Sequence, residues 1–190
     1  MRRRSFFSSL IAALLVGASA AADEEVAVPV ALQIELLIKV AAYDKNLPAR
    51  APSLVKVLIV SKRDDGQSSN AAQQAQRALA GKVVANRPTE ASALTFSDGP
   101  ALAARVREKG IAVVYVAPGF NQGELESIAR ALEGVSVLST GAVASFVQHG
   151  VVLSFDLVGG KPKLLVHLAR AQRQKVDLSA QVLKLVKVVE

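Results

Sequence analysis

The chain has no cysteine and no tryptophan, and its aromatic content is only 4%. Without cysteine it can form neither a disulfide nor a thiolate metal site, and it cannot carry the cysteine-linked lipid anchor of a bacterial lipoprotein. Hydrophobic residues nevertheless make up 51% of the 190 residues. We therefore expect one domain with an aliphatic core of Val, Leu, Ile and Ala, held together by packing alone.

Local motifs of the common enzyme classes are also absent. The sequence contains no G-x-S-x-G elbow, H-E-x-x-H pair, Walker loop or G-x-G-x-x-G fingerprint. Neither of the two histidines, His149 and His167, has a carboxylate close to it in sequence, and we expect His167 to be an ordinary surface residue. Asp64 and Asp65 are predicted to lie in a solvated loop. These absences predict a protein that is not an enzyme and has no cofactor and no metal, with a hydrolase of unrecognised site as the enzymatic alternative.

Positive charge exceeds negative charge, but it is not clustered. The 23 Lys and Arg residues and 16 Asp and Glu residues give a formal net charge of +7. Three of the arginines, Arg2, Arg3 and Arg4, lie in a segment that we expect to be removed, which leaves a mildly basic chain. The other basic residues are scattered without stacking aromatics, so we expect no nucleic-acid partner. The run Arg170–Lys175 is predicted to be an exposed helix face.

Residues 1–22 have the three parts of a secretory signal peptide. A basic start is followed by an apolar run over residues 6–16 and by the small-residue cleavage site Ala18-Ser19-Ala20, although cleavage after Ala22 also fits. The apolar run is shorter than the ~20 residues of a membrane-spanning helix. We predict an exported, periplasmic mature chain, residues 23–190, that is not embedded in the membrane. An uncleaved anchor is the alternative, and the export route, general or twin-arginine, stays open.

The mature chain alternates helical patterns with apolar strand patterns. Apolar spacing predicts helices over residues 29–44, 68–79, 98–109 and 122–132. Apolar runs predict buried strands over 54–60, 111–116 and 135–138 and a short edge strand at 82–85, while 86–93 is predicted to be a loop. This alternation is typical of an α/β fold in three layers, a mostly parallel mixed sheet flanked by helices.

Gly159 and Gly160 separate two alternating apolar runs and predict a closing antiparallel hairpin. Two glycines supply the positive φ angles of a type I′ turn, and such a turn fixes the register. The predicted cross-strand pairs are Val158 with Lys161, Asp156 with Lys163, Phe155 with Leu164, and Val152 with His167. After the hairpin we expect a C-terminal helix over residues 178–189 that ends the chain.

Ligands of parallel α/β sheets bind beyond the carboxyl ends of the strands. One predicted strand ends at Ser61 and Lys62 and another near Gly119. A third ends at the segment 139–141, which we expect to be a turn with backbone N–H groups free to bind an anion. With His149 at the start of the hairpin, the candidate ligand-binding residues are Ser61, Lys62, Gly119, Ser139, Thr140, Gly141 and His149.

Several segments together resemble the YfiR-like family of periplasmic regulatory proteins. They are ALQIELLIKVAAY, IAVVYVAPGF, VSVLSTGAVASFVQHGVVLSFDL and LLVHLARAQRQKVDLSAQVLKLVKVV. The resemblance covers roughly residues 29–189 and makes residues 23–190 a single YfiR-like α/β domain. His167 stands near an asparagine that is usual in the family, and residues 43–46 replace an aromatic, Trp-containing signal. The chain therefore resembles a distant member.

The resemblance implies a non-enzymatic regulator that acts by protein–protein contact. The family is similar to a periplasmic regulator that binds the sensor part of an inner-membrane diguanylate cyclase and represses cyclic di-GMP synthesis. The implied partner is the periplasmic domain of an inner-membrane signalling protein, and a homodimer is a further option. The redox-tuning disulfides of some members have no counterpart here, because the chain lacks cysteine. The alternative function is a periplasmic small-ligand-binding accessory protein of an uptake or envelope-sensing system.

Overall fold

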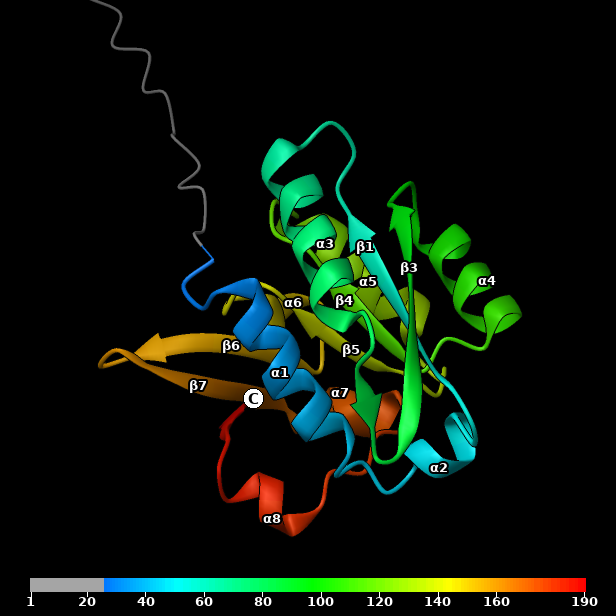
Figure 1. The fold of residues 1–190 in the computed structure, drawn as a ribbon. Coiled ribbons are helices and arrows are strands. Elements are labelled where there is room, and N and C mark those ends of the chain that lie inside the picture. Colours follow the sequence, from blue (N-terminus) through cyan, green and yellow to red (C-terminus); the bar gives the residue numbers. More distant parts are fainter. Residues whose placement is uncertain (1–25) are drawn as a thin grey trace, which may run out of the picture.

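The computed structural model describes residues 26–190, so the predicted signal peptide at residues 1–22 lies outside the described residues. Within them the chain forms eight strands and eight helices (Figure 1). The strands are β1 Val55–Ser61, β2 Val83–Val84, β3 Arg87–Thr95, β4 Val113–Val116, β5 Leu138–Gly141, β6 Leu153–Val158, β7 Lys161–His167 and β8 Lys187–Val189. The helices are α1 Val30–Ala41, α2 Leu47–Arg50, α3 Gly66–Leu79, α4 Gly99–Lys109, α5 Gln122–Leu132, α6 Phe146–His149, α7 Leu168–Arg173 and α8 Ala180–Leu183.

All the strands belong to one mixed sheet in the order β2-β3-β1-β4-β5-β6-β7-β8. The strands from β3 to β6 are parallel to one another, whereas β2 and β7 run antiparallel to β3 and β6. Helices α1 and α3 pack together on one side of the sheet, and α4 and α5 pack together on the other (Figure 1). The predicted fold class, a three-layer α/β fold with a mostly parallel mixed sheet, is therefore confirmed.

The centre of the sheet is buried on both faces. All four residues of β4 are buried, and so are five of the seven residues of β1. Strands that helices cover on both sides need apolar side chains in both directions, which is why β1 and β4 read as continuous apolar runs rather than as alternating ones.

The closing hairpin has the predicted register. Val158 pairs with Lys161, Asp156 with Lys163 and Phe155 with Leu164. The pattern continues inward, since the N–H of His167 donates to the carbonyl of Val152 at 2.9 Å. Gly159 and Gly160 have φ of 58° and 74°, as the type I′ turn requires. The outer end of the hairpin extends away from the body of the domain (Figure 1).

The loop predicted over residues 86–93 is wrong, because this segment lies within the nine-residue strand β3. The strand pairs with β1 along its length, from Val55 opposite Thr89 to Ser61 opposite Thr95. Its side chains are half-buried or exposed, with none fully buried. The prediction relied on apolar runs, and a strand whose side chains are not buried needs none. Strand β3 is held instead by backbone pairing with its buried neighbour β1.

The helix predicted over residues 178–189 is also wrong in its second half. Helix α8 covers only four residues, and the chain ends in strand β8, which pairs parallel to β7 from Leu165 opposite Lys187 to His167 opposite Val189. Strand β7 would otherwise leave its outer backbone groups unpaired, and the valines of β8 have a high preference for strands. Pairing with β7 therefore outweighs the helical pattern of apolar residues in this segment.

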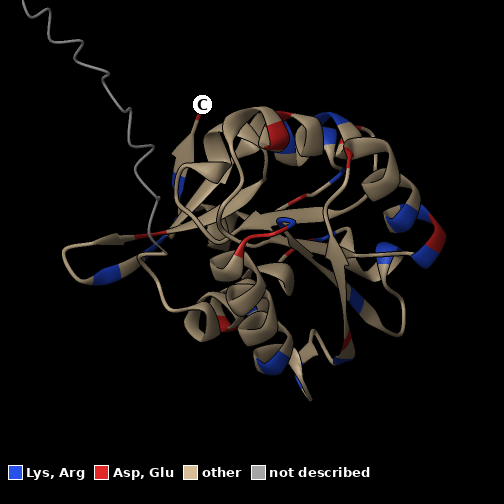
Figure 2. Ribbon diagram, turned by 90° about the horizontal axis from the view of Figure 1, so that it is seen from above, with Lys and Arg blue, Asp and Glu red and all other residues tan. Residues whose placement is uncertain are grey.

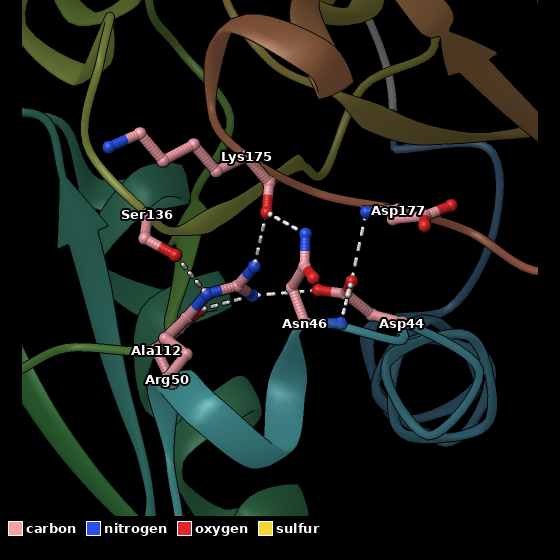
Figure 3. A network of polar contacts seen from close by, with 7 residues as sticks. All are labelled: Asp44, Asn46, Arg50, Ala112, Ser136, Lys175 and Asp177. Atoms are coloured by element: carbon pink, nitrogen blue, oxygen red, sulfur yellow. Dashed lines mark hydrogen bonds and ion pairs between the residues drawn. The ribbon is translucent and has the colours of Figure 1, made fainter.

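A buried ion pair fastens the end of α1 and the short helix α2 to the C-terminal segment (Figure 3). Arg50 Nη1 lies 2.8 Å from Asp44 Oδ2, and the two side chains are 4% and 0% exposed. Asp44 Oδ1 accepts the N–H of Asp177 at 3.0 Å, while Arg50 donates to the carbonyl of Lys175 and to Ser136 Oγ, each at 3.1 Å. We call these residues the Asp44–Arg50 cluster. Burial lowers the pKa of the Arg50 guanidinium, and the neighbouring Asp44 opposes this change.

Gln33 on α1 is a second buried polar residue with a complete set of partners. Its side chain is 0% exposed. Nε2 donates to the carbonyls of Val28 at 2.8 Å and Ala142 at 2.9 Å, and Oε1 accepts the hydroxyl of Tyr115 at 2.9 Å. Burial raises the pKa of that tyrosine, so its hydroxyl stays protonated and continues to donate. The amide thus joins α1 to the sheet with both donor and acceptor used.

Candidate ligand-binding site

The sheet has one topological switch point. Strands β1 and β4 are neighbours, but the chain leaves β1 for β3 on one side and returns through α4 to β4 on the other. The two connections diverge at the carboxyl ends of β1 and β4, which leaves a crevice at that edge of the sheet. Ligands of open α/β sheets bind at this place.

A cavity of about 430 Å³ occupies the crevice, and we call it the switch-point pocket. Its lining comes from the loop after β1, the loop after β4, the first turns of α3 and α5, and helix α6. The residues are Lys62, Asp65, Gln67, Pro118, Gly119, Phe120, Asn121, Gln122, Leu125, Val143, Ser145, Phe146 and His149. The volume lies within the range of about 300–1,000 Å³ that is common for small-molecule sites.

Asp65 and Gly119 fix the two loops against each other. Asp65 caps α3, since its Oδ1 accepts the N–H of Ser68 at 2.8 Å. Gly119 has φ of 93°, and a Cβ placed on it would lie 2.2 Å from Asp65 Oδ2. Glycine is therefore required there twice, by the backbone angle and by the close approach of the carboxylate.

Lys62 belongs to the pocket but already has anionic and carbonyl partners. Its Nζ donates to the carbonyl of Gly119 at 2.8 Å and lies 3.0 Å from Glu124 Oε2. Glu124 in turn accepts the N–H of Asn121 at 2.8 Å within the capping box of α5. Lys62 thus holds the loop after β4 in place, and its charge is balanced before any ligand arrives.

The floor of the pocket is apolar and the rim is polar. Phe120, Phe146 and Leu125 are 6%, 2% and 2% exposed. At the rim lie the amide of Gln67 and the imidazole of half-buried His149 at the end of α6. This combination suits a small polar molecule with an apolar part.

Three of the seven predicted ligand-binding residues come together in this pocket, namely Lys62, Gly119 and His149. Ser61, the last residue of β1, does not line the pocket, and its carbonyl accepts the N–H of Phe96 at 2.8 Å. The sequence order of strand and loop was sufficient to place Lys62 and Gly119 at this edge of the sheet, because each follows a recognisable apolar strand within three residues.

The turn predicted at residues 139–141 is wrong, because Ser139, Thr140 and Gly141 form the last three residues of β5. Ser139 and Thr140 are 0% exposed. Strand β6 pairs with Thr140 and Gly141, and the N–H of Val152 donates to Ser139 Oγ at 3.0 Å. The strand predicted over residues 135–138 is thus also misplaced, because β5 begins only at Leu138 and its backbone groups face a neighbouring strand rather than a ligand.

His167 is not an ordinary surface residue. It is half-buried and caps α7, with Nδ1 accepting the N–H of Arg170 at 3.4 Å. Burial lowers the pKa of His167, and the charges of Arg170 and Arg173 lower it further. The prediction that Arg170–Lys175 is simply an exposed face is also wrong, since Gln174 is 1% exposed and Arg170 is half-buried.

Charge and metal-ligating groups are dispersed over the domain. Lys and Arg lie on several separate elements with Asp and Glu among them (Figure 2). Among residues 26–190, no three His, Asp or Glu side chains come close enough together to hold a metal ion. The same stretch of chain contains no helix with the length and apolar character needed to cross a bilayer.

Solved structures with similar folds show little sequence identity to the chain. A conserved domain protein from Vibrio cholerae O1 biovar El Tor matches with a TM-score of 0.55 and 12% identity over 85% of this chain and 60% of that one. An ABC domain from Streptococcus pneumonia, solved in complex with L-Trp, matches with a TM-score of 0.50 and 14% identity over 85% and 62%. The chain thus spans less than two thirds of either protein, and the likeness concerns the fold alone.

A search of curated proteins found no relative of the chain. The family described as YfiR/HmsC-like matches residues 31–187, which is most of the described domain from α1 to the start of β8. The chain therefore belongs to the YfiR/HmsC-like family, a family of periplasmic regulators.

Proposed function

We propose that this protein is a non-enzymatic periplasmic regulator that binds the periplasmic domain of an inner-membrane diguanylate cyclase and lowers cyclic di-GMP by repressing that enzyme. Membership of the YfiR/HmsC-like family over residues 31–187 carries the proposal. The signal-peptide pattern of residues 1–22 supports a periplasmic location.

The outer end of the hairpin is the contact surface that we assign to the partner. It projects from the body of the domain (Figure 1), and its apolar residues Leu157 and Val158 are 43% and 58% exposed. Large apolar side chains on a projecting segment gain free energy when a partner covers them. A rigid hairpin also loses little conformational entropy on binding, which favours affinity.

Strand β8 offers a second contact surface beside the inner end of the hairpin. It is the last strand at its end of the sheet, and within residues 26–190 no strand pairs with its outer side. Leu185, just before β8, is 71% exposed, and Val188, within it, is 42% exposed. An open strand edge can pair with an extended segment of a partner by backbone hydrogen bonds.

The test compares two exposed valines at opposite ends of the sheet. Val158→Glu places a charge at the hairpin tip, and Val83→Glu places the same charge on β2, where Val83 is 53% exposed. We expect Val158→Glu to weaken binding to the purified periplasmic domain of the cyclase at least about tenfold, which corresponds to ~1.4 kcal/mol. Val83→Glu should change the affinity less than about twofold, because an isolated exposed site away from the contact is nearly neutral.

Cellular cyclic di-GMP supplies the functional measurement. Deletion of the gene should raise cyclic di-GMP, wild-type protein and Val83→Glu should restore the low level, and Val158→Glu should not. Unchanged cyclic di-GMP after deletion would show that the chain does not repress a cyclase. Equal binding by the two variants would instead remove the hairpin from the contact surface.

A second candidate function is binding of a small ligand in the switch-point pocket, which would make the chain an accessory protein of uptake or envelope sensing. The position of this pocket at the topological switch point favours it. A thermal-shift screen with amino acids and small organic acids tests it, because a ligand at 100 times its Kd stabilises the folded state by about 2.7 kcal/mol. His149→Ala should reduce the shift, whereas His167→Asn, outside the pocket, should leave it unchanged.

A further inference from the structure

A second and smaller cavity lies between the carboxyl end of α5 and helix α7, apart from the switch-point pocket. Its volume is about 70 Å³. This exceeds the about 30 Å³ that one water molecule occupies in the liquid, and it is far below the volume of a drug-sized site. The lining residues are Ala129, Arg130, Glu133, Arg170, Arg173 and Gln174.

Gln174 is buried at this cavity without a partner for its side-chain amide. It is 1% exposed, and neither Nε2 nor Oε1 forms a hydrogen bond with any residue of 26–190. A buried polar group without a partner destabilises the folded state, and native proteins rarely contain one. The Gln174 amide therefore has a free donor and a free acceptor, which a group from outside the described chain can bind.

Arg170 presents a positive charge to the same cavity. Its Nη1 is buried without a hydrogen-bond partner, and within the described residues no carboxylate forms an ion pair with its guanidinium. Burial and the neighbouring charge of Arg173 both lower the pKa of Arg170. A partly buried cation without a counter-ion is strongly unfavourable, whereas an anion in the cavity would compensate it.

Two nearby negative features do not balance this charge. Glu133 Oε1 lies 3.8 Å from Arg173 Nε, but the Arg173 and Glu133 side chains are 64% and 58% exposed, so solvent screens this pair. The carboxyl ends of α5 and α7 also favour cations, but this effect is weak at exposed helix ends. Neither feature forms a hydrogen bond or an ion pair with Arg170, so the positive charge of its half-buried guanidinium has no counter-charge in the described residues.

The unpaired atoms define the chemistry of the missing group. It must accept hydrogen bonds from Arg170 Nη1 and from the amide nitrogen of Gln174, and it must donate one to the amide oxygen. Water can serve the amide but brings no negative charge, whereas chloride, a carboxylate or sulfate has no hydrogen to donate at neutral pH. Inorganic phosphate combines negative charge, acceptor oxygens and at least one O–H group.

We propose that the cavity between α5 and α7 binds one hydrogen phosphate ion, held by Arg170 and Gln174 with Arg130 and Arg173 at its rim. The site joins two distant parts of the chain. The N–H of Gly134 donates to the carbonyl of Arg173 at 2.9 Å, and the N–H of Val137 donates to the carbonyl of Gln174 at 3.2 Å. Bound phosphate therefore stabilises the junction between α5 and α7.

Isothermal titration calorimetry of the wild-type chain with inorganic phosphate, in a chloride buffer at pH 7, tests the proposal. We expect one phosphate per chain, and at least tenfold weaker binding for Arg170→Gln. The matched control Arg107→Gln, at an exposed position of α4, should bind as the wild type does. No heat of binding with 20 mM phosphate would overturn the site.

Gln174→Glu keeps the test valid if Arg170→Gln unfolds the domain. The new carboxylate has nearly the shape of the amide, supplies Arg170 with a counter-ion and repels phosphate. We expect a folded protein with a higher melting temperature and no phosphate binding. A Gln174→Glu protein that binds phosphate as the wild type does would contradict the proposed position of the ion.

Two further ligands identify the ion. Sulfate should bind at least tenfold more weakly than phosphate, because it has no O–H group for the amide oxygen of Gln174. Glycerol 1-phosphate should also bind at least tenfold more weakly, since at pH 7 its phosphate group is mostly a dianion without the O–H group that the amide oxygen of Gln174 requires. Equal binding of sulfate would overturn the assignment to hydrogen phosphate, and equal or tighter binding of the ester would overturn the assignment to the free ion.

Discussion

Gln33 and Gln174 are both buried glutamines, 0% and 1% exposed, but their amides are in opposite states. The amide of Gln33 uses its nitrogen for two carbonyls and its oxygen for the hydroxyl of Tyr115. The amide of Gln174 has no partner in the described residues. Burial of a polar side chain therefore does not by itself distinguish a structural role from a binding role, whereas the count of its partners does.

Two arginines show the same contrast. Arg50 is paired with Asp44 and donates to several further groups, so its region is closed and holds distant segments of the fold together. Arg170 has a buried donor and no acidic partner in residues 26–190. We expect substitutions in the first region to change stability, and substitutions in the second to change binding with little loss of stability.

The largest effect should follow Asp44→Ala. This substitution leaves the Arg50 guanidinium, 4% exposed, buried without its counter-ion. Breaking a buried pair in this way costs about 3–5 kcal/mol. Urea unfolding followed by circular dichroism measures the loss, and a loss below about 1 kcal/mol would contradict the closed state of the cluster. Lys45→Ala, which breaks a pair exposed by 61% and 52%, is the matched control and should cost less than about 1 kcal/mol.

Gln33→Leu should have the next largest effect. The leucine leaves the carbonyls of Val28 and Ala142 and the hydroxyl of Tyr115 without their partner, and the three lost hydrogen bonds at a net value of about 1 kcal/mol each should cost about 3 kcal/mol together. Urea unfolding again gives the difference. Tyr115→Phe in the same series removes one of these bonds and should cost about 1 kcal/mol.

Gln174→Leu should lie within about 1 kcal/mol of the wild type when phosphate is absent. The leucine removes two buried atoms that have no partner, and its volume is close to that of glutamine. This outcome sharpens the comparison, because the same substitution is strongly destabilising at position 33. A loss at position 174 as large as that at position 33 would mean that the Gln174 amide has partners after all.

The smallest effect should be a change of stability with pH at His167. Burial and the charges of Arg170 and Arg173 lower its pKa in the folded protein below the unfolded value near 6.5. The unfolded state thus binds more protons, so the free energy of unfolding falls as the pH falls below about 6.5 toward the folded pKa. His167→Asn keeps an N-cap residue that does not titrate, and it should flatten the profile between pH 7.5 and 5.5. An identical slope for both proteins would remove His167 as the cause.

The predictable part of the fold was the part with strong local signals. Buried strands β1 and β4 stand out as apolar runs, α5 is predicted to the residue by its apolar spacing, and the two glycines of the hairpin give the register. Strand β3 and strand β8 were not predictable in this way, because each depends on pairing with a strand distant in sequence. Local propensity carries no information on such partners.

The same difference between local signals and distant partners applies to the candidate sites. The switch-point pocket could be found in part, since Lys62 and Gly119 each follow a recognisable strand within three residues. The missed features, the Asp44–Arg50 cluster and the cavity at Gln174, join residues far apart in the chain, such as Arg130 and Arg170. The only local signal for the second was the arginine-rich run Arg170–Lys175, which is equally typical of an exposed helix.

The bond from the N–H of Asp177 to Asp44 spans 133 positions, and Lys45 N–H donates back to the carbonyl of Asp177. The segment that follows α1 therefore cannot form these two bonds until residue 177 has been made. Contacts of such long range slow folding, because the loop must close before they form. During synthesis, a chain that lacks residue 177 cannot complete its tertiary structure.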